Sequence, residues 1–287
     1  MFVRRMNYSL KTRFIIGVFV SLFIFSVETI SAQTQSYLNT NNSVSVRGLK
    51  DILYVLDGLS ILRKDGTQVR LHQIDIPDHF RQDPGPISGH AKGRLGEILQ
   101  DQKIREYIPI KNSSQIQNRL GQDVLHIENL DGEWVQEVLI SEGLARVIPD
   151  QKLEDITIHL LKVEYQARKE KKGLWEDSAY KIHSAETIKP SAWEMQIVED
   201  KIKKIATIKN NTYLNFGDNW RTDFTILIPS KIRQYYTKKG IDIFSFQDQK
   251  IQVRGYVEDF NGPLIKLESP SHLIFPDRIF PETSPSE

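Results

Sequence analysis

One stretch of this sequence decides its fold: Val69-Arg70-Leu71-His72-Gln73-Ile74-Asp75-Ile76-Pro77-Asp78. Its apolar residues follow a β-type pattern, and two shorter runs of the same kind precede it at residues 52–56 and 60–63. Asp57-Gly58 and Asp65-Gly66 separate the runs, and Asp-Gly is a strong turn signal. The sequence therefore predicts three consecutive strands, the third over residues 68–74.

The residues that follow predict a small barrel closed by helices. Apolar residues recur every three or four positions over residues 87–99, which indicates a helix. Two β-type runs come next, at residues 104–110 and 124–127. A second helix opens after Asp131-Gly132-Glu133, and a third ends in a basic last turn before Gly173. This order predicts a mainly β fold with α-helices, in the form of a five-stranded barrel.

A second unit repeats the same order of elements. Strands are predicted over 197–208, 212–216 and 223–228, then a helix over 230–239 with Ser230 as its N-cap, then strands over 250–257 and 264–267. Three strands, a helix and two strands is the order of an OB-like barrel. The predicted division is a signal segment 1–32, a polar spacer 33–48, a first barrel domain 49–176, a linker 177–194, a second barrel domain 195–280 and a disordered tail 281–287.

The N-terminus has the pattern of an export signal. A basic stretch precedes an apolar run at residues 14–27, and Ile30-Ser31-Ala32 places a small residue at the expected cleavage point. Fourteen residues rise about 21 Å as a helix, less than the roughly 30 Å hydrocarbon core of a bilayer. We expect a periplasmic or secreted protein. The alternative is an uncleaved anchor that holds the chain at the membrane, facing outward.

Composition excludes several classes of site. The chain has 287 residues and no cysteine, so it holds no disulfide, thiolate metal site or cysteine nucleophile. Its seven histidines have no zinc-binding spacing, and no P-loop or Gly-x-Ser-x-Gly motif is present. The formal charge is +1, but four of the 38 basic and one of the 37 acidic residues lie within residues 1–32. Residues 33–287 therefore hold 34 basic and 36 acidic residues. This part of the chain has no surplus of positive charge with which to bind nucleic acid.

Residues 49–175 resemble the staphylococcal nuclease-like (thermonuclease) family. The resemblance rests on Asp57-Gly58, on Val-Arg-Leu with Asp75-Ile76-Pro77-Asp78, and on the helix that ends before Gly173-Leu174-Trp175. It implies a barrel of the OB type and a calcium-dependent phosphodiester hydrolase. The second unit, around Thr212 to Asp218, looks like an OB-type domain that is appended to such nucleases in bacteria.

The resemblance assigns site roles position by position. Arg70 matches the family's first catalytic arginine, and Asp75 matches one calcium-binding aspartate. Asp78 stands at the position of the catalytic glutamate, and the backbone carbonyl of Ile76 at a calcium position. The other positions depart from the family pattern: Leu59 replaces the second calcium aspartate, Ser60 replaces a threonine, and Gln122 replaces the second arginine in Leu120-Gly121-Gln122.

Structural roles explain the same residues equally well. The alternative for Arg70 is a structural ion pair with Asp75 or Asp78. The alternative for Asp57-Gly58 is an ordinary hairpin turn. In the second unit an aromatic cluster, Tyr213, Phe216, Trp220, Arg221 and Phe224, lies over strands that form the usual ligand face of an OB-fold. We take Tyr213, Trp220, Arg221 and Phe224 as candidates for binding nucleic acid by base stacking, the alternative being core packing.

Three functions remain open from the sequence. The first is an exported thermonuclease-like protein with a degenerate catalytic site that binds single-stranded nucleic acid or an envelope protein. The second is a weak metal-dependent endonuclease acting on DNA or RNA through Arg70, Asp75 and Asp78. The third is a purely structural pair of barrels within an envelope assembly. No cofactor is expected, except Ca²⁺ if the site is catalytically active.

Overall fold

The computed structural model describes residues 36–77, 79, 85–100, 103–110 and 116–280. The predicted signal segment and the C-terminal tail lie outside these residues. Within the described part of the chain no helix is long and apolar enough to cross a membrane. Residues 34–287 form one compact unit. Its fold is mainly β with α-helices, as the sequence predicts.

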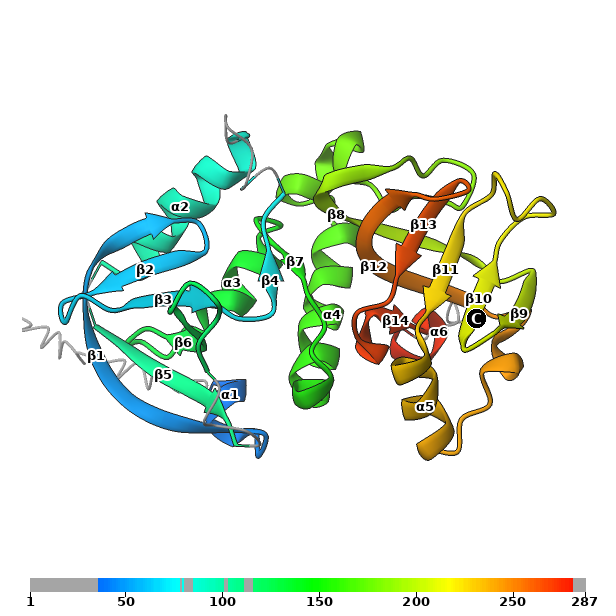
Figure 1. Ribbon diagram of the computed structural model, residues 1–287. Coiled ribbons are helices and arrows are strands. Elements are labelled where there is room, and N and C mark those ends of the chain that lie inside the picture. The colour runs from blue at the N-terminus through cyan, green and yellow to red at the C-terminus, as the bar shows by residue number, and fades with distance from the viewer. Residues whose placement is uncertain (1–35, 78, 80–84, 101–102, 111–115, 281–287) are drawn as a thin grey trace, which may run out of the picture. The chain divides into compact units, whose positions relative to one another are not determined.

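A closed five-stranded barrel forms the N-terminal half (Figure 1). Its strands pair in the order β1 (Val44–Asp57), β2 (Ser60–Arg63), β3 (Gln68–Leu71), β6 (Asp123–Glu128) and β5 (Lys103–Pro109), and β5 closes the circuit onto β1. The β3–β6 pair is parallel, whereas the others are antiparallel. Buried side chains fill the barrel, among them Ile61 and Leu125 from the strands and Leu59 from the turn between β1 and β2.

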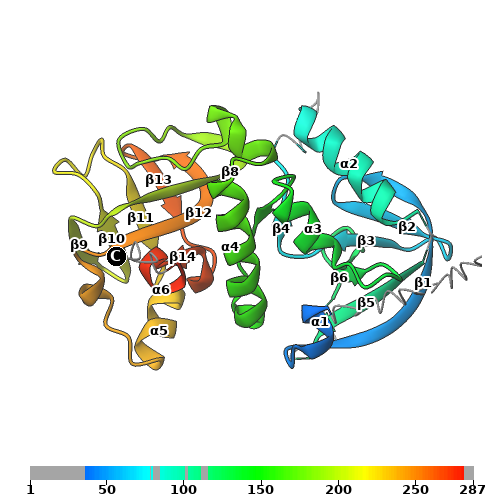
Figure 2. The same ribbon diagram turned by 180° about the vertical axis from the view of Figure 1, so that it is seen from behind.

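Helices and a short second sheet surround this barrel. The helices are α1 (Tyr37–Thr40), α2 (Pro86–Ile98), α3 (Val135–Ser141) and α4 (Glu154–Lys169). Both views of the ribbon place α2 beside β1 and β2 (Figures 1 and 2), and α2 contacts β1 directly. A two-stranded sheet joins β4 (Ile74–Asp75) to β7 (Arg146–Val147). Short 3₁₀ turns lie at Gln151–Leu153, Gly173–Glu176 and Ser178–Tyr180.

The C-terminal half is a seven-stranded sheet with the same pattern of pairing. Its strands are β8 (Ser191–Lys201), β9 (Lys204–Ile208), β10 (Asn211–Asn215), β11 (Thr225–Ile228), β12 (Lys250–Asp259), β13 (Pro263–Lys266) and β14 (Leu273–Ile274). Neighbouring strands pair in the order β9, β10, β11, β13 and β12, and β12 also pairs with β8. The β11–β13 pair is parallel. Helices α5 (Ser230–Lys238) and α6 (Pro276–Ile279) complete this half, with 3₁₀ turns at Ile243–Phe246 and Pro270–His272.

Four local predictions differ from the structure. The strand predicted over 68–74 ends at Leu71, and Ile74–Asp75 form the separate strand β4, which pairs with β7. Part of the predicted spacer is ordered: α1 lies within it and β1 begins at Val44, because Val44 and its neighbours pair with β5. The strand predicted over 197–208 breaks at Ile202 and Lys203 into β8 and β9, which pair with different strands. Ser230 is the first residue of α5 rather than its N-cap, a position that Pro229 takes.

Candidate functional site

Arg70 lies on β3, between β2 and β6, and its side chain is half-buried. Burial lowers the pKa of its guanidinium, while the nearby Asp57, Asp75 and Tyr256 act in the opposite direction. Arginine stays protonated at any physiological pH despite such a shift. The structure thus keeps a partly desolvated cation close to two of the carboxylates that the sequence singled out, and Tyr256 of β12 lies near it.

Asp75 is engaged in a buried ion pair. The β4–β7 pairing places Asp75 directly opposite Arg146, and Arg146 Nη2 donates to Asp75 Oδ2 at 2.7 Å. The exposed fractions of the two side chains are 3% for Arg146 and 11% for Asp75. The sequence left open an ion pair of Arg70 with Asp75 or Asp78, and it did not point to Arg146 as a partner of Asp75. Arg146 lies 71 positions from Asp75 in the sequence, so spacing does not reveal the pair. The one indication in the sequence is that Arg146 lies within the apolar segment Leu144-Ala145-Arg146-Val147, where a charged residue needs a partner.

The turn between β1 and β2 is built as a structural turn. Leu59 is fully buried and belongs to the barrel core, so its alkyl group packs against other side chains. Asp57 Oδ1 accepts a hydrogen bond from the Leu59 backbone N–H at 2.7 Å, and Asp57 Oδ2 lies 3.7 Å from His79 Nε2. A Cβ at Gly58 would lie 2.8 Å from the side chain of Ile76, so the turn packs closely against that segment.

His79 lies beside these acidic residues. Burial lowers the pKa of its imidazole, and Arg70 acts in the same direction, whereas Asp57 and Asp75 raise it. Its backbone N–H donates to the carbonyl of Ile76 at 3.2 Å, the carbonyl that the family resemblance assigns to calcium. Asp78, the candidate for the catalytic carboxylate, lies outside the described residues.

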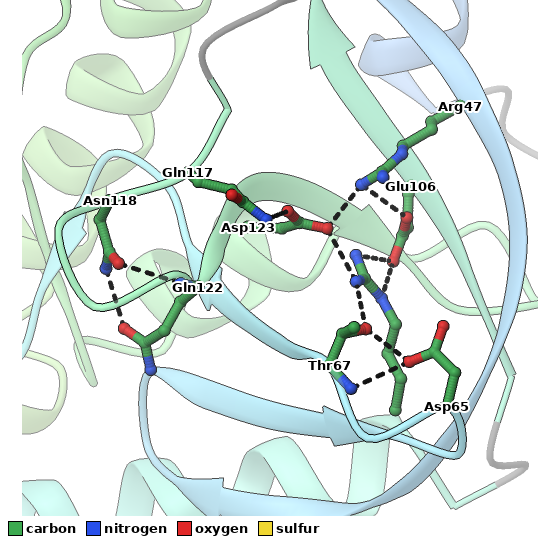
Figure 3. A network of polar contacts seen from close by, with 9 residues as sticks. Arg47, Asp65, Thr67, Glu106, Gln117, Asn118, Gln122 and Asp123 are labelled. Carbon is green, nitrogen blue, oxygen red and sulfur yellow. Dashed lines mark hydrogen bonds and ion pairs between the residues drawn. The ribbon is translucent and has the colours of Figure 1, made fainter.

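Gln122 is held in a network of side-chain amides. Its Oε1 accepts from Asn118 Nδ2 at 2.9 Å (Figure 3). Its Nε2 donates to Gln68 Oε1, also at 2.9 Å. A left-handed Gly121, with φ at 74°, shapes the turn before it. An amide carries no charge, so this position lacks the cation that the family's second arginine supplies there.

A second ionic cluster was missed from the sequence. Arg63 donates to Glu106 at 2.6 Å and to Asp123 at 2.8 Å, and Arg47 donates to Asp123 at 2.6 Å (Figure 3). Arg63, Glu106 and Asp123 are buried, and burial raises the pKa of the Glu106 carboxyl although Arg63 opposes the rise. The four side chains come from β1, β2, β5 and β6, so only the closed barrel brings them together. Two cations thus neutralise two carboxylates within its wall.

The donors of the described residues do not fit a calcium ion. Calcium takes six to eight oxygen ligands, with carboxylates prominent among them. Leu59 offers no oxygen from its side chain, and the carboxylate of Asp75 accepts a buried guanidinium. Among the residues that the structure describes, no three His, Cys, Asp or Glu side chains gather closely enough to hold a metal.

The aromatic candidates of the C-terminal half divide into two groups. Tyr213 and Trp220 line one pocket, and the guanidinium of Arg221 lies 4.9 Å from the centre of the Trp220 ring. Phe224 is wrong as a stacking residue: it is 1% exposed and packs against Phe216 in the core, so neither face of its ring is available to a base. Phe224 directly precedes β11, only four positions after Trp220, so the sequence did not separate the buried ring from the exposed one.

Comparison with known proteins supports the nuclease resemblance. A search of the curated proteins found no match. A family model described as "Staphylococcal nuclease homologue" matches residues 68–177. The matched segment begins at β3 and runs through β6, β7 and α4, while β1 and β2 complete the barrel upstream of it. This chain therefore contains, over residues 68–177, a domain of the staphylococcal nuclease family.

Proposed function

We propose that this protein is an exported binding module built on a nuclease fold, in which the family's cleavage site is degenerate. The observation that carries the proposal is the buried pair of Asp75 and Arg146, because it commits the one matching calcium aspartate to a guanidinium. A calcium ion there would lie beside a fixed positive charge, which disfavours its binding. The ligand under this proposal is single-stranded nucleic acid or an envelope protein.

Two further replacements support a degenerate site. Phosphodiester cleavage builds negative charge on the phosphate oxygens, and a bidentate arginine is well suited to stabilise it. Loss of such an arginine costs roughly 10³ to 10⁵ in rate in other phosphoryl transfers. Gln122 replaces that arginine here, and Asp78 is one methylene shorter than the family's glutamate. A displacement of about 1 Å can itself cost about 10²-fold.

A weak metal-dependent endonuclease is the second candidate. It is favoured by Arg70, which remains on β3 with Asp57 and Asp75 close enough to affect its pKa. Catalysis would then run through Arg70 and Asp78, with a metal held by Asp75 and other oxygens. The two candidates differ in whether calcium binds.

Calcium is therefore expected to leave thermal stability almost unchanged. A ligand at a hundredfold excess over its Kd stabilises a protein by about 2.7 kcal/mol, which would raise the Tm of a chain of this size by about 5 to 10 °C. We expect a change below about 1 °C between millimolar calcium and EDTA, measured by differential scanning calorimetry. A rise of several degrees that is lost in Asp75→Ala, each variant compared with itself in EDTA, would favour the endonuclease.

Export is the second part of the proposal, and it rests on the basic and apolar pattern of residues 1–32. Fractionation of cells that produce the tagged chain should place it outside the cytoplasm, and its N-terminal sequence should begin at Gln33 after cleavage behind Ala32. An outward-facing chain with its N-terminus intact would indicate the membrane anchor instead. Recovery of the intact chain in the cytoplasm would contradict export.

A further inference from the structure

We propose that the pocket lined by Tyr213, Trp220 and Phe260 binds one unstacked base of a single-stranded nucleic acid. The inference rests on the proposed function as a binding module, and it names the ligand class and the site. The pocket has a volume of about 280 Å³. It lies on the C-terminal sheet, and none of the residues that line it belongs to the nuclease-family segment.

The floor of the pocket is one face of the sheet. Lys204, Ala206 and Ile208 alternate along β9, and Tyr213 and Asn215 alternate along β10, so that each set projects to the same side. The β9–β10 register places Tyr213 opposite Ala206 and Asn215 opposite Lys204. The floor thus combines an aromatic ring and small apolar groups with an amide. These are the groups that contact the faces and edges of bases.

Two loops form aromatic walls above this floor. Trp220 comes from the β10–β11 loop and is 57% exposed, and Phe260 comes from the β12–β13 connection and is 63% exposed. Large aromatic rings left this open are available for stacking, which is worth about 1–3 kcal/mol per base. The two walls therefore offer stacking surfaces that the core of the domain does not use.

The two loops approach each other closely and one is braced by a hydrogen bond, which favours a preformed pocket. Gly262, beside Phe260, has a φ of +88°, and a Cβ there would lie 2.5 Å from the carbonyl oxygen of Thr222 in the other loop. Asp223 accepts a hydrogen bond from the Asn219 backbone N–H at 2.7 Å and braces the Trp220 loop. A preformed pocket loses little conformational entropy when a ligand enters.

Charges at the rim suit a phosphate backbone. The Arg221 guanidinium lies 4.9 Å from the Trp220 ring centre, so that stacking on Trp220 would bring an adjoining phosphate near a cation. Lys204 adds a second cation at the floor. The carboxylate of Asp218 also lines the pocket, but Lys203 Nζ lies 3.2 Å from it and offsets its charge. Aromatic walls with two cations favour a nucleic acid over an uncharged peptide.

The test is binding of a fluorescein-labelled, single-stranded oligothymidylate to the full chain in EDTA, followed by anisotropy. Trp220→Ala and Phe260→Ala should each weaken binding by roughly 5- to 150-fold. Phe244→Ala removes a similarly exposed aromatic ring from the same half, outside this pocket, and should leave affinity unchanged. With two phosphate contacts, a rise from 50 to 200 mM salt should weaken binding about sevenfold.

Three results would overturn the inference: no binding, binding that Trp220→Ala and Phe260→Ala leave unchanged, or displacement of the oligonucleotide by a neutral aromatic peptide that binds more tightly. A gel of the recovered oligonucleotide after incubation with calcium separates this inference from the proposed function. Intact oligonucleotide supports a non-cleaving protein whether or not it binds in the pocket. Cleaved oligonucleotide contradicts the proposed function even if the pocket residues govern affinity.

Discussion

An Arg254→Met variant is expected to lose about 3–5 kcal/mol of unfolding free energy, because it leaves a carboxylate buried without its cation. The guanidinium of Arg254, on β12, donates to both carboxylate oxygens of Glu164, on α4, and its Nη1 also donates to the carbonyl of Val147 at 2.8 Å. Both side chains are essentially fully buried, at 0% and 1% exposed. The pair therefore links the C-terminal sheet to the nuclease-family domain.

Chemical denaturation and calorimetry measure this loss. At about 2–4 °C per kcal/mol, the Tm should fall by about 6 to 20 °C. Lys203→Met, which breaks the exposed pair with Asp218, is the control and should cost at most about 1 kcal/mol. Arg254→Met combined with Glu164→Leu should recover much of the loss, because the unpaired charge is gone. A loss below 1 kcal/mol in the single variant would contradict a structural role for the pair.

The same pair touches the candidate site. Arg254 holds the carbonyl of Val147, which lies next to Arg146 on β7, and Arg146 neutralises Asp75 on β4. The Glu164 carboxylate also accepts from the Val147 N–H at 2.8 Å. The C-terminal sheet thus helps to fix the strand that presents Arg146 to Asp75. No motif in the sequence indicates that Arg254 and Glu164 contact Val147.

Local patterns predicted the elements of the fold well. The Asp-Gly turns and the period-two runs located β2 and β3, and the helical stripe over 87–99 located α2 within one residue at each end. The closed barrel of the N-terminal half follows from the order of its elements, whereas the second predicted barrel is a seven-stranded sheet in the structure. The polar composition of residues 37–48 led to the wrong prediction of a loose spacer. The structure of this segment depends on pairing with β5 and on burial of Leu38, which local composition does not indicate.

The candidate site was less predictable, since its partners come from distant positions. The resemblance assigned roles to Arg70 and Asp75, and in the structure the carboxylate of Asp75 acts to raise the pKa of Arg70. It did not indicate Arg146, which reaches Asp75 through the β4–β7 pairing, nor the Arg63 cluster across four strands. Phe224 and Trp220 are four positions apart, yet one is buried and the other exposed, because one lies in the core and the other in a loop.

The central claim, that the nuclease fold here has lost its cleavage activity, predicts the largest effect of all. Replacement of one arginine costs roughly 10³ to 10⁵ in rate, and a displaced base about 10²-fold more. Such effects need not add when residues act as a unit, but together they are large enough to remove most of an enzyme's rate advantage. The arginine is replaced by Gln122, whose amide is already engaged by Asn118 and Gln68.

The most direct measurement is incubation of the chain from Gln33 onward with single-stranded DNA and with RNA in millimolar calcium. We predict no cleavage above a protein-free blank. Arg70→Ala should then behave like the unmodified chain, and so should Arg94→Ala, in which the replaced arginine pairs with Glu142 away from the candidate site. Calcium-stimulated cleavage that persists in Arg94→Ala but disappears in Arg70→Ala would contradict the account.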